Sequence, residues 1–390
     1  MNWPTYKLGT VADFCLGKML DQKKNRGELL PYLANINVRW GEFDLTDLRE
    51  MRFEQHELER YGLRYGDIVM CEGGEPGRCA IWKEQRSAMM IQKALHRIRP
   101  HNCLQPEFLF YYFLYKGRSG HLSPLFTGST IKHLPREKLA LVEVPVPPRP
   151  VQNEIASILS AYDDLIENNR RRIALLEQTA RLLYREWFVC FRFPGHEHIK
   201  IIDGVPEGWE RKTLKEIADI TMGQSPKSVY YNEEGRGLPF HQGVTNFGIR
   251  FPTHETYCTI ESRVGKPGDI LFSVRAPVGR INITPDKIII GRGLAAIRST
   301  NSQQNYLFYA LKSHFFKEDM IGGGSIFAAI TKKDLHDVEL MQPPKQIVEQ
   351  FMEHVIPIDL QIENLQKAIE KLAHARDLLL PKLMNGEVAV

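Results

Sequence analysis

The sequence contains TGSTIKHLPREKLALVEVPVPP at residues 127–148 and GGSIFAAITKKDLHDVELMQPP at residues 323–344. The two stretches align without a gap when one is shifted by 196 positions. Gly128 then meets Gly324, and both stretches end on a pair of prolines. The chain therefore repeats a segment of itself, and the length of this repeat determines which fold we expect.

The repeat extends through both halves of the chain. The opening WPTYKLGTVADFCLG (3–17) matches WERKTLKEIADITMG (209–223), and YGDIVMCEGGEPGRCAI (65–81) matches PGDILFSVRAPVGRINI (267–283). The segments between the matched blocks, such as 18–60 and 224–262, do not match. The period is far longer than the 20–50 residues typical of solenoid repeats. We therefore expect one domain-sized unit that is used twice, with variable segments inserted into a common framework.

The first part of each unit, about 145 residues, predicts a mixed α/β domain. Short runs rich in β-branched residues lie between glycine, proline and asparagine, and predict strands: GDIVMC, KALHRI, LALVEVPV, GDILFSV and GRINI. Short helices are predicted at PEFLFYYFLY and QQNYLFYALK. The fold class that we expect is α+β, with two homologous mixed α/β domains related by an internal pseudo-twofold repeat.

The second part of each unit shows the heptad pattern of a long helix, with seam positions that alternate in steps of four and three. The first seam comprises Ile155, Leu159, Tyr162, Ile166, Asn169, Ile173, Leu176, Ala180, Leu183 and Trp187. The second comprises Phe351, Val355, Ile358, Ile362, Leu365, Ile369, Leu372, Arg376, Leu379 and Leu383. We expect the two helices to pair as a coiled coil, although each helix packed on its own globular domain is an alternative. Pro357 is expected to interrupt the second helix, so that its long part begins near Asp359.

Length and composition are compatible with several functions. A chain of 390 residues exceeds one ordinary core, and no apolar run reaches the roughly 20 residues of a membrane span. The six cysteines form no C-x-x-C pair and the N-terminus MNWPTYKLGT lacks signal-peptide features, so we expect a cytoplasmic protein with reduced thiols. A net charge of +4 allows a DNA partner without itself indicating one.

Motifs for catalysis and cofactor binding are not found in the sequence. It has no G-x-x-x-x-G-K-[ST] loop for ATP, no G-x-G-x-x-G after a predicted strand and no G-x-S-x-G elbow. It also lacks the N-P-P-[FY] or D-P-P-Y motif of amino-methyltransferases. We therefore expect a non-catalytic chain that has no cofactor and no metal site.

Polar side chains suited to DNA recur in the two α/β parts. Arginine suits guanine, asparagine and glutamine suit adenine, and lysine, serine and threonine more often hold phosphates. The candidates in the first unit are Lys18, Lys23, Lys24, Asn35, Asn37, Arg39, Trp40, Ser129, Thr130 and Lys132. Those in the second are Gln224, Ser225, Lys227, Gln242, Thr245, Asn246, Arg275 and Ser325, with Phe247 as a possible stacking residue. For any one of them, an ordinary solvent-exposed position is the alternative.

The order of these segments resembles the specificity subunits of type I restriction-modification enzymes over essentially the whole chain. The resemblance rests on the W-x₄-L-x₃-A opening of each unit, the YGDIV and PGDIL turns, and the run from GST to the proline pair. It also rests on LLEQTARLLYREWF and LLLPKLMNGEV, which close the two helical parts. The duplicated order is more specific than any single motif.

The resemblance implies a subunit with two target recognition domains, each for one half of a split double-stranded DNA site, and an antiparallel coiled coil between them. It implies no catalysis by the chain itself, which would dock two methyltransferase subunits and, in the full complex, two restriction subunits. The assembled complex would be an adenine-specific DNA methyltransferase and an ATP-dependent endonuclease. The implied boundaries are residues 1–148 and 193–344 for the recognition domains, the second including a linker, and 149–192 and 345–390 for the helical regions.

Two alternatives from other classes remain at this stage. One is a coiled-coil scaffold protein that does not bind DNA. The other is the DNA-recognising part of a fused restriction enzyme, against which the missing methyltransferase motifs count. The polar seam residues Asn169 and Arg376 leave the exact pairing of the helices open.

Overall fold

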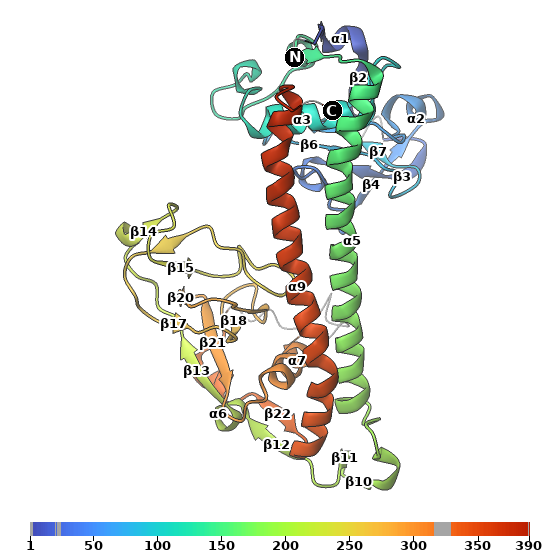
Figure 1. Ribbon diagram of the computed structural model, residues 1–390. Coiled ribbons are helices and arrows are strands. Elements are labelled where there is room, and N and C mark those ends of the chain that lie inside the picture. The colour runs from blue at the N-terminus through green and yellow to red at the C-terminus, as the bar shows by residue number, and fades with distance from the viewer. Residues whose placement is uncertain (1–2, 20, 22–24, 316–328, 389) are drawn as a thin grey trace. The chain divides into compact units, whose positions relative to one another are not determined.

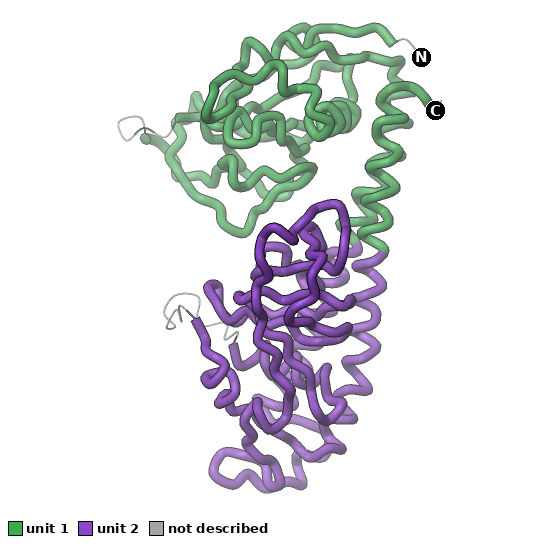
Figure 2. Tube along the Cα trace, turned by 90° about the vertical axis from the view of Figure 1, so that its left-hand side faces the viewer, with its two compact units in different colours: residues 1–168, 368–390 green, residues 169–367 purple. Residues whose placement is uncertain are grey.

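The computed structural model describes all residues except 1–2, 20, 22–24, 316–328 and 389. The chain divides into two compact units, residues 1–168 with 368–390 and residues 169–367 (Figure 2). Each unit contains one α/β domain together with one half of each long helix. No helix in the described part of the chain is long and apolar enough to cross a membrane.

Two sheets and a short strand pair form the α/β domain of the first unit. Strand β1 (Thr5–Lys7) pairs antiparallel with β9 (Glu143–Pro145). A four-stranded sheet has the order β2 (Ala12–Leu16), β8 (Leu95–Pro100), β5 (Ile68–Cys71) and β6 (Cys79–Ile81). A second sheet has the order β4 (Arg49–Phe53), β3 (Glu28–Leu33) and β7 (Met90–Ile91), in which β3 and β7 are parallel.

Helix α3 (Pro106–Arg118) is the centre of the core in this unit. Proline at its first turn suits a position where no backbone N–H donor is needed. The aromatic and leucine run that follows, Phe108–Leu114, is buried without interruption, as expected for a helix that is covered on all sides. The shorter helices are α1 (Leu8–Val11), α2 (Gln55–Tyr61) and α4 (Arg136–Leu139).

The second unit repeats this arrangement. Strand β12 (Glu210–Thr213) pairs with β22 (Glu339–Gln342), and a four-stranded sheet has the order β13 (Ala218–Met222), β21 (Leu294–Ser299), β18 (Ile270–Ser273) and β19 (Ile281–Ile283). Its helices α6 (Leu214–Ile217), α7 (Gln304–Phe315) and α8 (Lys332–His336) are equivalent to α1, α3 and α4. The strands and short helices expected from the sequence are therefore confirmed, and so is the repeat.

The two units differ in the other sheet. In the second unit it has five short strands in the order β14 (Tyr231–Asn232), β16 (Tyr257–Cys258), β15 (Leu238–His241), β20 (Ile288–Ile290) and β17 (Val264–Gly265). The parallel pair of β15 and β20 is equivalent to β3 and β7. A hairpin of β10 (Ile201–Ile202) and β11 (Val205–Pro206) precedes this domain. The variation thus lies around a conserved parallel pair.

The repeated Gly-Asp turn shows why the matched motifs recur. Gly66 and Gly268 have φ angles of 86° and 84°, a region that favours glycine. The following Asp67 accepts a hydrogen bond from the Arg64 amide at 2.8 Å and forms an ion pair with Arg99. Asp269 repeats both contacts, with the Lys266 amide at 2.7 Å and with the guanidinium of Arg298. The motif therefore holds the framework together in both units.

Helices α5 (Arg149–Phe188) and α9 (Lys345–Met384) pair antiparallel (Figure 1). This is the coiled coil that the heptad pattern and the family resemblance led us to expect. In the first unit, Ile155 and Leu159 share a core with Leu380 and Leu383. In the second, the ring of Trp187 lies 6.0 Å from the ring of Phe351. The start of each helix thus meets the end of the other. All the expected seam positions are buried or partly buried, Ile166, Ile173, Ile362, Leu365 and Ile369 among the buried ones.

The expected break at Pro357 is wrong, because α9 continues through this residue without interruption. Proline in a helix interior costs about 3 kcal/mol, since it removes one hydrogen bond and crowds the preceding turn. Buried Val355 anchors the helix just before Pro357. Just after it, Asp359 accepts hydrogen bonds from Asn305 and Tyr309 of α7. Packing on both sides therefore outweighs the local preference.

Candidate nucleic-acid interface

A surface hollow of ≈ 870 Å³ in the first unit brings together residues that are distant in the sequence. Its lining includes three of the candidates, Trp40, Thr130 and Lys132. Arg118, at the end of α3, also lines it and forms an ion pair of 3.0 Å with Asp377. Such a hollow, with two cationic groups and an aromatic ring, suits the phosphates and base edges of DNA.

The loop 127–133 forms one side of this hollow. Thr127 and His133 are joined by two backbone hydrogen bonds of 2.8 Å, which close the loop at its base. Gly128 has a φ of 94°, and a Cβ atom there would collide with the carbonyl oxygen of Ile131. Only glycine therefore permits this turn. The turn leaves Ser129, Thr130 and Lys132 exposed, together with an Ile131 side chain that is 62% exposed.

Two candidates of the first unit are buried and stabilise the domain through internal contacts. Lys18 is 4% exposed and forms an ion pair with Glu57. Asn37, also 4% exposed, donates to the carbonyl oxygens of Asp44 and Asp47 at 3.0 and 3.1 Å. We therefore correct the expected set by removing Lys18 and Asn37 from the DNA-facing residues. A sequence pattern does not show such burial, because it depends on how the chain folds back on itself, over 39 residues for Lys18 and over 7 and 10 residues for Asn37.

The remaining candidates of this unit have mixed positions. Asn35 donates to the Gly73 carbonyl oxygen at 2.7 Å, and the indole of Trp40 donates to Glu75 at 2.6 Å. Arg39 is exposed, with its guanidinium 3.5 Å from Asp44. Lys23 and Lys24 lie outside the described residues, as does Ser325 of the second unit.

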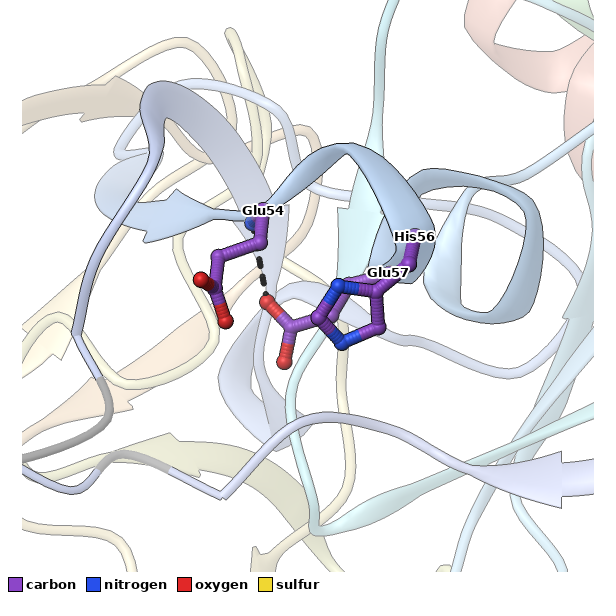
Figure 3. Close-up of side chains that lie close together, drawn as sticks. All are labelled: Glu54, His56 and Glu57. Carbon is purple, nitrogen blue, oxygen red and sulfur yellow. Dashed lines mark hydrogen bonds between the residues drawn. The ribbon is translucent and has the colours of Figure 1, made fainter.

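Three neighbouring side chains at the start of α2, Glu54, His56 and Glu57, could by their spacing hold a metal ion (Figure 3). Glu57 Oε2, however, accepts the Glu54 amide at 3.0 Å, which caps the helix, and also binds the Lys18 ammonium. Burial alone would raise the pKa of Glu57, but the Lys18 and Glu54 contacts outweigh it and lower this pKa. A helix cap and an ion pair thus account for the arrangement, and we assign no metal to it.

A second hollow, of ≈ 340 Å³, lies in the second unit and is lined by the candidates Gln242, Thr245 and Asn246. Ser225 donates to the side-chain oxygen of Gln242 at 2.7 Å, so two separate candidate segments meet here. Gln224 and Lys227 are exposed beside Ser225. Phe247 is partly buried and packs against the core that contains Leu271, so its expected role as a stacking residue stays a prediction.

Arg292 is a residue of this surface that the sequence analysis missed. It is exposed, and its amide donates to the hydroxyl of Ser225 at 3.1 Å. The flanking Gly291 and Gly293 allow the close approach of Gln242, because a Cβ atom at Gly291 would lie 2.8 Å from the Cα atom of Gln242. The short sequence GRG at 291–293 was the signal that could have identified this arginine.

His241, which lines the second hollow, pairs with a second histidine, His254. Nε2 of His241 lies 2.9 Å from Nδ1 of His254, whose other ring nitrogen lies 3.2 Å from Asp286. Burial, and then the neighbouring His254, lower the pKa of His241 to about 4. The buried imidazole of His241 is therefore neutral near pH 7 and adds no positive charge to the hollow.

Arg275, which lines neither hollow, lies at a position of the framework that the two units share. It is exposed and forms a β-bridge with Ala329. The equivalent residues of the first unit, Gly73 and His133, form the same bridge at the base of the loop 127–133. The bridge is thus part of the shared framework, whereas the side chain at position 275 is specific to the second unit.

Comparison with known proteins identifies the family. Residues 1–178 and 206–374 match the family described as "Type I restriction modification DNA specificity domain". The chain belongs to this family. The specificity subunit of Methanocaldococcus jannaschii named for the type I restriction enzyme MjaX is 31% identical over all of this chain and 94% of its own length. The MjaIX specificity subunit of the same organism is 27% identical over the same shares.

The fold of a specificity subunit is also found among solved structures. The crystal structure of the S subunit from the type I restriction-modification system of Mycoplasma genitalium aligns with a TM-score of 0.58. The alignment covers 98% of this chain and 96% of that chain at 20% identity. Membership of the specificity-subunit family makes the chain a non-catalytic subunit whose role is recognition of DNA.

Proposed function

We propose that the chain recognises a bipartite, asymmetric site in double-stranded DNA, with one half-site for each unit. The observation that carries this proposal is a repeated framework with two different surfaces. The first hollow contains Trp40, Thr130 and Lys132, whereas the second contains Gln242, Thr245 and Asn246. Two identical domains would select a symmetric site, because a symmetric protein requires a symmetric target. Two diverged domains in one chain permit an asymmetric one.

The chemistry of the two surfaces supports different roles for their residues. Gln242 and Asn246 carry amide groups that can contact adenine, while Arg39 and Arg292 can contact guanine. Lys132, Lys227, Ser129 and Thr130 suit phosphates, which supply affinity and position the protein. We propose these described and accessible residues, with Trp40, Gln224, Ser225, Thr245 and Arg275, as the DNA-binding set.

We also propose that the chain docks two methyltransferase subunits and, in the complete enzyme, two restriction subunits. Leu182 of α5 and Leu378 of α9 are equivalent in the repeat, and their side chains are 44% and 57% exposed. Single exposed leucines are common and need no explanation. An exposed leucine at the same position of both repeats, in contrast, provides two similar apolar contacts, which suits two copies of one partner. Such a complex acts on DNA, and we place it in the cytoplasm.

The test uses the chain alone and together with its methyltransferase subunit in a host without adenine methylation. Sequencing of modified bases should show one asymmetric bipartite motif only when both proteins are present. The purified chain, incubated with DNA and S-adenosylmethionine, should transfer no methyl groups. Transfer by the chain alone would indicate a fused enzyme. A complex that neither methylates DNA nor binds it in a salt-dependent manner would indicate a scaffold protein.

A further inference from the structure

Arg250 is a buried cation within the variable segment 224–262. Its side chain is 2% exposed, although the loop that carries it, between β15 and β16, also carries exposed residues. Its guanidinium donates from Nε to Glu177 of α5 at 2.6 Å and from Nη2 to the hydroxyl of Tyr309 at 2.8 Å. Nη1 lies 2.9 Å from Asp359 of α9. One side chain therefore contacts three helices of the second unit.

The partners of Arg250 form a closed ionic cluster. Lys312 donates to the second oxygen of Glu177 at 2.9 Å, and Tyr309 donates to Asp359 at 2.6 Å. We refer to Arg250, Glu177, Lys312, Tyr309 and Asp359 as the Arg250 cluster. Its two cations balance its two carboxylates, as buried charges require. Burial alone would raise the pKa of Glu177, but the charges of Arg250 and Lys312 lower it.

In the described part of the first unit, no equivalent link to the variable segment is found. Asp163, which corresponds to Asp359, also accepts a tyrosine hydroxyl, from Tyr111 at 2.7 Å. Its cation is Arg376, which belongs to α9 and not to the α/β domain. The variable segment of this unit contacts α3 through Trp40, whose ring leaves no room for a Cβ atom at Gly117. A buried ionic link between variable segment and long helices is thus found, among the described residues, in the second unit.

The backbone connects Arg250 directly to the residues of the second hollow. The amide of Gly248 donates to Phe251, and that of Thr253 donates to Asn246 at 2.9 Å. The carbonyl oxygen of Arg250 accepts from the amide of Ile283 in the four-stranded sheet at 2.8 Å. Asn246 therefore lies on a short, hydrogen-bonded loop, and the Arg250 cluster determines where that loop sits against the helices.

We propose that Arg250 is the positioning residue of the second recognition surface: it fixes the loop of Gln242, Thr245 and Asn246 on the helices of its unit. This inference rests on the proposed function. It assigns Arg250 no contact with DNA, because its guanidinium is buried against Glu177, Tyr309 and Asp359. Its loss affects discrimination at the second half-site and leaves discrimination at the first unchanged.

The experiment uses the complex with the methyltransferase subunit. The wild-type methylation motif supplies DNA duplexes with single base changes in one half-site or the other. Binding of these duplexes is measured for wild type, Arg250→Lys and Arg250→Met. In the Met variant, discrimination at the second half-site should fall about tenfold or more, within the range that one mismatched base pair contributes. Arg250→Lys should retain part of it, because one ammonium cannot replace a guanidinium that contacts three partners.

Two further variants separate positioning from loss of stability. Arg298→Met removes the ion pair with Asp269 in the same unit, away from the cluster, and should keep the motif and the discrimination of wild type. Arg250→Met combined with Glu177→Gln keeps Lys312 balanced by Asp359, so it provides a charge-balanced variant if the single change does not fold. This double variant should show the same selective loss as Arg250→Met.

The outcomes distinguish the two proposals. A wild-type complex without a bipartite motif would contradict the proposed function itself. A wild-type motif together with unchanged second half-site discrimination in every folded Arg250 variant would overturn the positioning role alone. Equal loss at both half-sites, or the same loss in Arg298→Met, would also overturn it, because that pattern indicates general destabilisation.

Discussion

Asp163 on α5 and Asp359 on α9 are equivalent residues of the repeat, and each accepts a tyrosine hydroxyl from the α/β domain of its own unit. The distances are 2.7 Å from Tyr111 and 2.6 Å from Tyr309. In both units this hydrogen bond joins the domain's central helix to a long helix. The repeat therefore preserves the attachment of the domain, while the cation that neutralises the aspartate comes from a different segment in each unit.

Asp163→Asn should destabilise the first unit. The amide can still accept from Tyr111, but Arg376, whose side chain is 12% exposed, then keeps only Asp377 as a carboxylate partner. We expect a loss of about 1.5–3 kcal/mol in the free energy of unfolding, the range for a hydrogen bond to a charged group. Urea denaturation followed by circular dichroism measures it. Asp164→Asn is the control, because its pair with Lys83 is exposed and should contribute less than about 1 kcal/mol. Equal losses in the two variants would contradict the prediction.

Gly128→Ala should weaken DNA binding through the loop 127–133. The new methyl group collides with the carbonyl oxygen of Ile131, so the loop must rearrange and displace Thr130 and Lys132. Gly195→Ala provides a matched control, because Gly195 has a similar φ of 84°, has open space around it and lines neither hollow. Both variants carry backbone strain of about 1–2 kcal/mol, but only the first carries the collision. Affinity of the complex for its DNA should fall in Gly128→Ala alone; a similar affinity in the two variants would exclude this loop from the interface.

The stability of the second unit should decrease in acid because of His241. The pKa of this histidine is 6.5 in the ordinary case and about 4 in the folded chain. Between these values the unfolded chain binds a proton that the folded chain does not, so stability is fully present above about pH 6.5 and is lost as the pH falls. The loss should reach about 2 kcal/mol by about pH 5, with roughly 1.4 kcal/mol for each pH unit.

Denaturation of wild type and His241→Asn at about pH 7.5 and about pH 5 measures this contribution. Carboxylates titrate in both proteins, so the informative quantity is the difference between them. The variant should lose less stability than wild type on acidification. The same loss in both proteins would show that His241 is not the responsible group.

Leu182→Glu and Leu378→Glu should each remove one methyltransferase subunit from the complex. A carboxylate at the centre of an apolar contact is left buried without a partner, which is costly. Native mass spectrometry should show one bound subunit for each single variant and none for the double variant. Leu175→Glu is the control, because Leu175 is 63% exposed on α5 but its repeat equivalent is Lys371. Loss of both subunits in one single variant would contradict two equivalent docking positions.

The sequence predicted those features that depend on local patterns. The heptad positions and the strand runs follow from periodicity within a few turns, and the repeat is visible wherever the framework requires one residue type, as at Gly66 and Gly268. Pro357 was misjudged because its local effect is overcome by packing with residues of another helix. Local rules do not include such partners.

The candidate surfaces were predicted less well, for the same reason. Lys18 and Arg250 are long cationic side chains, which are usually exposed. Here each is buried by a carboxylate that lies 39 or 73 residues away in the sequence. Arg292 lies beside Gln242 because the fold brings the two flanking glycines, Gly291 and Gly293, close to Gln242. Which cations remain exposed is thus decided by long-range partners, and the pattern of residue types identified only the segments.

Because Arg250 lies inside the variable segment 224–262, that segment itself supplies the cation that attaches it to the helices. A recombination event that replaced this segment with one lacking a cation at the same place would leave the cluster with two carboxylates and one cation, Lys312, which pairs with Glu177. Asp359 would lose its ion-pair partner Arg250. Such a chimera would have a new recognition surface, but the cluster that attaches it to the helices would carry an uncompensated negative charge. New specificities at this half of the chain would therefore arise from exchange among segments that already carry a matching positive charge, or from crossovers accompanied by a compensating change in α5 or α9.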